Sequence, residues 1–428
     1  MNKVISTKYQ ETYYEETLDN GLRVIIWHKP NYEKSFAMMA TPLGGFDLIQ
    51  SDSKGNTKEY PSGLAHFLEH KMFEKDNEDV MEEFSRMGAN VNAATSYDNT
   101  CYFFQTSDDI EEPLNLLLDF TQEFDINEQS VEKEKGIIVQ ELNMYQQMSD
   151  FRLVRETFIS LYKNHPLKYD VGGTTDDVNN TSLNDLMECY KYNYHPSSML
   201  CIVVTGKDPE EILNIVRNNQ KKKEFESIDL MKRNEINEPR EVVLKNKSFE
   251  MDVNKPKVNI AFKFEGVKNA KERVLLDTGL RFILDTLFTP VNPEYQEWLD
   301  NNIINDFFGY DYDFGADYGY LMIYSETTKK EEFIKLVFDK INSLKDFEFD
   351  QQIFEQLKRR YYGENIRELN DFENIAFNYV RFYFNDIDYL SIYDCIESMK
   401  ISDLQKVLNF LDFNYYSIIE CNPMKKSD

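Results

Sequence analysis

The chain of 428 residues, 41% of them hydrophobic, is long enough for two or three domains with cores of their own. Its 76 acidic and 48 basic residues give a formal net charge of -28. Long-range repulsion therefore argues against nucleic acid and anionic lipid as partners. It leaves either basic or neutral partners or a merely solvated acidic surface.

Residues 1–14 begin the chain with a polar segment that lacks the apolar core of a signal peptide. No apolar run elsewhere is long enough to span a membrane. The five cysteines are scattered, odd in number and without a C-x-x-C pair, as is typical of free thiols in a reducing compartment. We therefore expect a cytoplasmic protein without a membrane span.

The first half of the chain is predicted to alternate between short apolar strands and amphipathic helices. The turn Asn20-Gly21 leads into the first clear strand, and Gly44-Gly45 follow the second. The predicted elements are strands at 22–27, 36–41, 88–96, 100–104 and 199–205, and helices at 62–70, 112–124, 131–145 and 182–192. This mixture predicts an α+β domain.

The helix at 62–70 carries an H-x-x-E-H array, for which we expect Ser62 to be the N-cap. Positions i, i+3 and i+4 share one face of a helix, so His66 and His70 can bind one ion while Glu69 lies beside them. Two histidines and one further carboxylate leave the fourth position of a tetrahedral zinc open to water, and Glu69 can take the proton of that water. The order is that of the inverzincins. The alternative is a helix with two unrelated surface histidines.

The helix at 131–145 has two glutamates within its apolar stripe. Val131, Ile138 and Leu142 mark the stripe, and Glu134 and Glu141 fall inside it. A buried carboxylate without a partner costs several kcal/mol, so we expect a metal or a charged hydrogen-bond network here. The alternative is a wider stripe with both glutamates at its rim.

The order of elements starts again after residues 221–240, a charged segment that we take as a linker. Residues 241–244 correspond to the strand at 24–26, and the helix and strand within 402–419 correspond to those within 184–204, both with an offset of 218 residues. Equal offsets predict a duplicated unit of about two hundred residues, with chance similarity of generic patterns as the alternative. No histidine follows His195, so only the first half can hold this kind of zinc site.

These motifs together resemble the pitrilysin or insulinase-type zinc metallopeptidases, which include mitochondrial processing peptidase. The resemblance covers most of the chain. It rests on Leu18–Val24, the H-x-x-E-H array, Asn92–Ser96, Glu134 with Glu141, and Asn193–Met199 followed by Gly206. It implies two homologous α/β-sandwich domains that form a clamshell, with a zinc-binding catalytic domain at 1–220, the linker at 221–240 and a non-catalytic domain at 241–428.

The resemblance also implies a role for each site residue. Zinc would be bound by His66, His70 and Glu141; Glu69 would be the general base; Glu134 would steady a histidine; and Asn92 and Ala93 would hold the substrate main chain by β-augmentation. The implied activity is that of a zinc-dependent endopeptidase acting on short or extended peptides, among them precursor or leader peptides of ribosomally made peptides.

One departure from the family concerns substrate binding. The family often carries an Arg and a Tyr that grip substrate, and here Asp300 and Phe307 stand in the corresponding stretch 299–307. The chain is similar to the zinc-bearing subunit of bacterial two-component members, so we expect a homologous partner that supplies Arg and Tyr in a heterodimer, or else a homodimer. Arg360 and Tyr361 are candidate substitutes, but Lys358, Arg359 and Arg360 are more typical of an exposed helix face.

Two other functions fit the same sequence. A non-catalytic family member could serve as a structural or docking subunit, although such proteins typically lose zinc ligands. A metal-dependent hydrolase could also act on something other than peptides.

Overall fold

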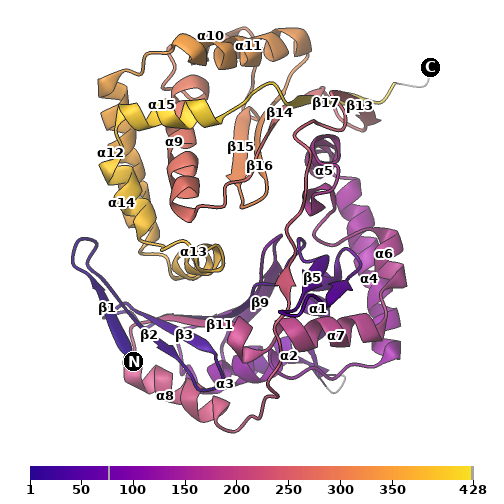
Figure 1. Cartoon of the computed structure of the whole chain (residues 1–428), viewed down its shortest axis with the longest axis vertical. Coiled ribbons are helices and arrows are strands. Elements are labelled where there is room, and N and C mark those ends of the chain that lie inside the picture. Colours follow the sequence, from indigo (N-terminus) through magenta and orange to yellow (C-terminus); the bar gives the residue numbers. More distant parts are fainter. Residues whose placement is uncertain (76–77, 426–428) are drawn as a thin grey trace. The chain divides into compact units, whose positions relative to one another are not determined.

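The central strands of the first half are almost continuously apolar because the sheet that they form is covered on both faces. The computed structural model describes residues 1–75 and 78–425. Strands β4 (Ser35–Thr41) and β11 (Leu200–Thr205) are buried at every position, and β3 (Arg23–His28) is buried at its four central positions. They lie in a seven-stranded sheet of order β1-β2-β3-β11-β4-β10-β9 (Figure 1).

This sheet belongs to the first of two packing units, which comprises residues 1–142, 170–234 and 366–385. Strand β9 forms one edge of the sheet, and on the described residues it pairs only with β10. The remaining strands of the unit are β1 (Asn2–Ser6), β2 (Glu11–Thr17), β5 (Ile49–Ser51), β6 (Thr57–Glu59), β7 (Glu74–Lys75), β8 (Glu78–Asp79), β9 (Asn90–Thr95), β10 (Thr100–Thr106) and β12 (Lys232–Arg233). Its helices are α1 (Leu64–Met72), α2 (Val80–Arg86), α3 (Glu111–Phe120), most of α4 (Glu128–Gln146), α6 (Thr175–Asn180), α7 (Leu183–Asn193), α8 (Pro209–Gln220) and α13 (Phe372–Phe384).

Alternate residues of the strands serve the two faces of the sheet. On one face, side chains such as Val24, Met39 and Tyr102 join the core cluster that contains residues of α1, α3 and α7. On the other face, Trp27 and Phe103 contact Tyr379 and Phe377 of α13, with ring centroids 6.2 and 5.1 Å apart. Helix α1 is therefore held against the sheet by its own apolar residues.

The second unit repeats the strand arrangement of the first. It comprises residues 143–169, 235–365 and 386–428, and its sheet has the order β13-β17-β14-β16-β15. The pair β13·β17 is parallel, as is β3·β11, and the other pairs are antiparallel in both series. The elements are α5 (Ser149–Leu161), β13 (Asn246–Met251), β14 (Lys257–Phe264), α9 (Ala270–Phe288), α10 (Tyr295–Asp300), β15 (Gly309–Phe314), β16 (Gly319–Glu326), α11 (Lys330–Ser343), α12 (Gln351–Glu368), α14 (Ser391–Ser398), α15 (Ile401–Phe410) and β17 (Tyr416–Pro423). The predicted duplication is confirmed at the level of the fold.

Each unit contains one helix from the other half of the chain. Helix α5 packs on the sheet of the second unit, where Asn259 donates to Thr157 at 2.8 Å, and α13 packs on the sheet of the first. The packing units are therefore discontinuous, whereas the predicted domains at 1–220 and 241–428 follow the repeat along the chain. Residues 221–240 contain no helix and only the short strand β12.

The predicted strand at 241–244 is wrong. Strand β13 starts later, at Asn246. The backbone N–H groups of Val243 and Leu244 both donate to the carbonyl of Ser160, at 2.8 and 3.0 Å. A carbonyl in the last turn of a helix lacks a partner within the helix, and this one takes the N–H groups that a strand would have offered to its neighbour.

Candidate metal centre

Helix α1 starts at a close contact between two backbone segments. Its N-cap is Gly63, with a φ of 87°, so the prediction that Ser62 caps the helix is wrong. A Cβ atom at Gly63 would lie 2.3 Å from the carbonyl oxygen of Gly172, so a side chain has no room there. The hydroxyl of Ser62 instead donates to the carboxylate of Asp177.

The imidazoles of His66 and His70 lie side by side on α1, with ring centroids 4.5 Å apart. Their Nε2 atoms are 3.8 and 3.6 Å from the same carboxylate oxygen, Oε2 of Glu141 on α4. All three ligand atoms lie within 4.8 Å of one another. A tetrahedral zinc with bonds of about 2.0–2.1 Å needs ligand atoms roughly 3.3 Å apart, which is close to the two distances to Glu141.

One imidazole of the donor set, that of His66, has the charge state that a metal requires. Burial, together with the neighbouring His70, lowers the pKa of His66 to about 4, so His66 is neutral near pH 7. Burial alone would lower the pKa of His70, but its hydrogen bond to Glu134 and the charges of nearby carboxylates raise it. A neutral imidazole is the form that binds a metal. The residues present therefore fit a zinc ion.

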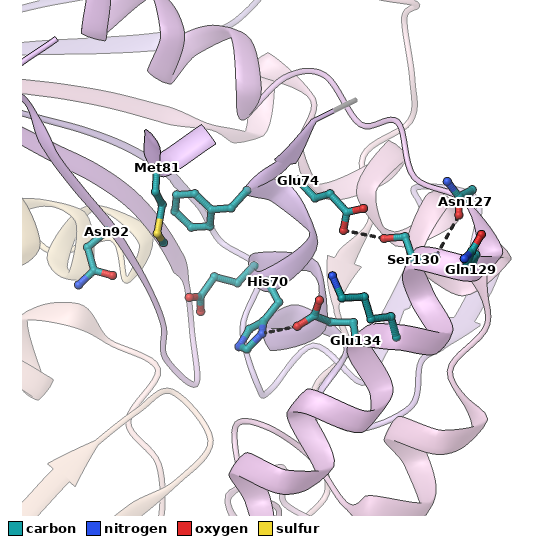
Figure 2. A pocket seen from close by; sticks show the side chains of 11 residues that line it. His70, Glu74, Met81, Asn92, Asn127, Gln129, Ser130 and Glu134 are labelled. Carbon is teal, nitrogen blue, oxygen red and sulfur yellow. Dashed lines mark hydrogen bonds and ion pairs between the residues drawn. The ribbon is translucent and has the colours of Figure 1, made fainter. Parts of the chain in front are cut away.

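Glu134 holds His70 from the side opposite to Glu141. Its Oε1 lies 3.0 Å from Nδ1 of His70 (Figure 2). Its Oε2 lies 3.4 Å from Nζ of Lys71. Burial raises the pKa of Glu134, but the His70 hydrogen bond and the Lys71 charge outweigh burial and lower it overall. The ionised carboxylate can only accept, so Nδ1 of His70 donates, and in the neutral ring the lone pair then lies on Nε2.

Glu69 is partly buried and is held by Thr95. The hydroxyl of Thr95, on β9, donates to its Oε2 at 2.5 Å. Burial raises the pKa of Glu69, and the hydrogen bond from Thr95 opposes that rise. A carboxylate with a raised pKa takes up a proton more readily than an ordinary one, which suits a general base.

A cavity of about 710 Å³ opens beside this group of residues (Figure 2). Asn92 of β9 lines it together with Glu69, while Ala93 is the next residue of the same edge strand. The N–H of Ala93 is engaged locally by Oδ1 of Asn92 at 2.9 Å. The lining residues are Glu69, His70, Phe73, Glu74, Met81, Asn92, Asn127, Gln129, Ser130, Lys133 and Glu134.

The structure thus brings together every site residue named from the sequence except Ala93, which only neighbours the cavity. Sequence reasoning missed two further contacts, those of Thr95 with Glu69 and of Lys71 with Glu134. Thr95 lies in the segment Asn92–Ser96 that carried the resemblance. The contact of Lys71 could have been suspected from the sequence, because a lysine directly follows His70 on a mostly apolar helix.

The candidate substrate residues of the second unit are engaged within that unit. The side chain of Tyr361 is fully buried, and its hydroxyl donates to Asp285 at 2.5 Å. Arg359 and Arg360 are exposed, and Arg360 donates to Glu364 at 2.8 Å. These contacts agree with an exposed helix face for the arginines and do not present Tyr361 to a ligand.

A duplicated α/β fold whose first half alone carries an H-x-x-E-H helix places the chain among the inverzincin-type peptidase folds. The family model described as Insulinase (Peptidase family M16) matches residues 54–175, and the one described as Peptidase M16 inactive domain matches residues 180–361. The chain therefore belongs to the insulinase family of peptidases.

Several relatives match along almost the whole chain. An uncharacterized zinc protease of Bacillus subtilis, YmfH, is 33% identical over 401 residues, which are 93% of this chain and 94% of the relative. Zinc protease PqqE of Helicobacter pylori is 23% identical over 423 residues, 94% of this chain and 90% of the relative. The crystal structure of an M16-like peptidase from Alicyclobacillus acidocaldarius superposes with a TM-score of 0.93 at 27% identity, covering 98% of this chain and all of that one. Within the described part of this chain, no helix is both long and apolar enough to cross a bilayer.

Proposed function

We propose that the chain is a zinc-dependent endopeptidase. The observation that carries the proposal is the convergence of Nε2 of His66, Nε2 of His70 and Oε2 of Glu141, with Glu69 lining the adjoining cavity. Two histidines and one carboxylate form a three-residue ligand set that leaves a position open for water, as catalytic zinc sites require. The names of the relatives, which are zinc proteases, support the same chemistry.

The mechanism assigns one task to each side chain. His66, His70 and Glu141 would hold the zinc, which when bound acidifies water and polarises the carbonyl of the scissile bond. Glu69 accepts a proton from the attacking water and delivers it to the leaving amine. Glu134 keeps the Nδ1 proton of His70 in place.

An extended peptide is the substrate that best suits the cavity. Strand β9 is an edge strand beside Glu69, so a peptide could pair with it as a further strand near Asn92 and Ala93. The net charge of -28 favours basic peptides through long-range attraction, and precursor or leader peptides are candidates. A value of kcat/KM that falls steeply with added salt would support this preference, and a flat salt dependence would contradict it.

We also propose that the chain is the catalytic subunit of a pair. Asp300 and Phe307 stand where the family often has Arg and Tyr, and a carboxylate cannot donate the hydrogen bonds of a guanidinium. A homologous partner, or a second copy of the chain, would complete substrate binding. Robust proteolysis by the monomeric chain would remove the need for such a partner.

The decisive test of the activity is the variant Glu69→Gln. It keeps the shape of the side chain but cannot take a proton, so we expect wild-type zinc content and a loss of turnover of about a thousandfold or more. The matched control is Glu132→Gln, an exposed glutamate on α4, which should change neither quantity. Zinc content is measured by elemental analysis and turnover with a peptide library, with and without a homologous partner protein.

Two results would overturn the proposal. One is a Glu69→Gln variant that cleaves as fast as the wild type. The other is a zinc-loaded wild type that cleaves no peptide of the library even with its partner, which would favour the structural or docking function instead.

A further inference from the structure

Lys71 is a fully buried cation in the first unit. It follows His70 on α1, and its side chain is 0% exposed. Removing an ammonium group from water is costly unless opposite charges surround it. Its Nζ is ion-paired with the carboxylate of Glu74 and lies 3.4 Å from Oε2 of Glu134. The metal centre as described so far gives this lysine no task.

The contact of Lys71 with Glu134 determines how that carboxylate is turned. One oxygen of Glu134 accepts from His70 and the other faces Lys71, at 3.0 and 3.4 Å. A carboxylate held at both oxygens cannot rotate freely about its last bond. Such partners fix the ring orientation of a histidine that binds a metal, because the ring follows the acceptor of its second nitrogen. Lys71 therefore acts on His70 without touching it.

The contact of Lys71 with Glu74 connects α1 to α4, the helix that carries Glu141. Ser130, in the first turn of α4, donates to Oε2 of Glu74 (Figure 2), and the two atoms are 2.7 Å apart. The backbone N–H of Ser130 donates to Oδ1 of Asn127 at 3.0 Å, which fixes the start of α4. Glu141 lies about three turns further along the same helix. A shift of α4 by one residue would move Glu141 by about 1.5 Å along the helix axis.

We propose that Lys71 is a positioning residue of the metal centre. Through Glu134 it orients His70, and through Glu74 and Ser130 it fixes the position of α4 and hence of Glu141. The inference rests on one part of the proposed function, the binding of zinc, and not on peptide cleavage. It predicts that the charge of Lys71 tunes metal affinity more than it tunes folding.

The test compares Lys71→Met with the double variant Lys71→Met/Glu74→Gln. Met has a similar length and no charge, so the single variant leaves Glu74 without its cation, whereas the double variant removes both charges together. We expect both to bind zinc at least tenfold more weakly than the wild type in chelator competition. We expect the double variant, measured without metal, to unfold at nearly the wild-type temperature, because replacing a buried ion pair by uncharged groups is often neutral for stability.

A spectroscopic measurement separates positioning from general loosening. Cobalt absorption reports ligand geometry, and we expect both variants to change the intensity of the visible bands. The control is Phe67→Leu, a change at a buried residue of the same helix whose side chain belongs to the apolar core. It should lower the unfolding temperature and leave zinc affinity and the cobalt spectrum unchanged. If Lys71→Met alone fails to fold, the double variant still decides the question.

The inference is overturned if the double variant binds zinc as tightly as the wild type. It is also overturned if Phe67→Leu weakens zinc binding as much as the double variant does. Failure of the proposed activity would be recognised separately. In that case the wild type would bind zinc, His66→Ala would not, and no peptide would be cleaved. The affinity difference caused by Lys71 would still be measurable.

Discussion

The carboxylate that completes the candidate metal centre of the first unit has a counterpart in the second. Glu141 and Glu364 are 223 residues apart, which is also the separation between the first residues of α5 and α13. Each glutamate lies on the helix that precedes its exchanged helix. Glu141 faces two imidazoles, whereas Glu364 accepts hydrogen bonds from Arg281 and Arg360, at 2.7 and 2.8 Å.

Helix α9 of the second unit also carries a pair of functional groups four residues apart, as α1 does. Arg281 makes the ion pair just described, and Asp285 accepts from the hydroxyls of Tyr310 and Tyr361 at 2.6 and 2.5 Å. The second unit therefore joins its two helices with cations and hydroxyls that belong to the chain. The comparison teaches that this fold does not need an ion at this position. The ligand set of the first unit is accordingly best explained by chemistry, not by folding.

The largest difference between the two units is expected when Glu141 and Glu364 are replaced one at a time. We expect Glu141→Ala to weaken zinc binding by about a thousandfold or more, roughly 4 kcal/mol, because one of three ligands is lost. We expect Glu364→Ala to leave zinc binding unchanged. Chelator competition with both variants measures the difference. Equal effects of the two variants would mean that the ion does not bind where the first unit places its donors.

The effect of metal removal on the unfolding temperature should depend on the donors of the first unit and not on the ion pairs of the second. A ligand at a thousand times its Kd stabilises the folded state by about 4 kcal/mol, so chelation should lower the unfolding temperature of the wild type. His66→Ala should show no shift on chelation, whereas Arg281→Met, altered in the second unit, should show the full wild-type shift. Differential scanning calorimetry with and without chelator checks this. A full shift in His66→Ala would assign the bound ion to other residues.

Much of this arrangement could be predicted from sequence because its causes are local. The spacing of His66 and His70 follows from helix geometry, and the positions of Glu134 and Glu141 in an apolar stripe follow from the same period. The repeat could be found because the order of strands and helices survives where residue identities do not. The offsets themselves differ, since 223 residues separate the first residues of β3 and β13 and 218 separate those of α7 and α15. The central strands were recognisable because their apolar runs are continuous.

Other features could not be predicted because their causes lie elsewhere in the chain. The apolar faces of α5 and α13 indicate burial but not the sheet that buries them, so the exchange of helices was invisible. Val243 and Leu244 have real β-propensity, but the carbonyl of Ser160 takes their N–H groups. Ser62 does not cap α1, because its hydroxyl donates to Asp177, over a hundred residues away. The N-cap Gly63 has no room for a side chain, because Gly172 approaches it closely.

A smaller effect is expected from the hydroxyls that join the helices of the second unit. Tyr361→Phe removes one of the two hydrogen bonds that Asp285 accepts in a buried site, and should lower the free energy of unfolding by about 1.5–3 kcal/mol. Zinc affinity and turnover should stay at wild-type values, since the metal centre belongs to the other repeat. Urea unfolding gives the first quantity and chelator competition the second. The control Arg359→Ala, on the exposed face of α12, should change stability by less than about 0.5 kcal/mol.

The smallest effect is expected on kcat, from a residue that holds the candidate general base of the first unit. Thr95→Val keeps the shape of the side chain but removes the hydrogen bond from the Thr95 hydroxyl to Glu69, so the carboxylate should sample more orientations. We expect kcat to fall about tenfold, or about 1.4 kcal/mol, with zinc affinity unchanged. Thr95→Ser keeps a hydroxyl at the same carbon and should restore most of kcat. A Thr95→Val variant with wild-type kcat, or one that loses zinc together with kcat, would show that Thr95 supports the strand and does not orient the base. The distinction matters because the second unit reproduces the strand order of the first. An effect on kcat alone would therefore come from the side chains that the first unit adds to the shared fold, and not from the strands.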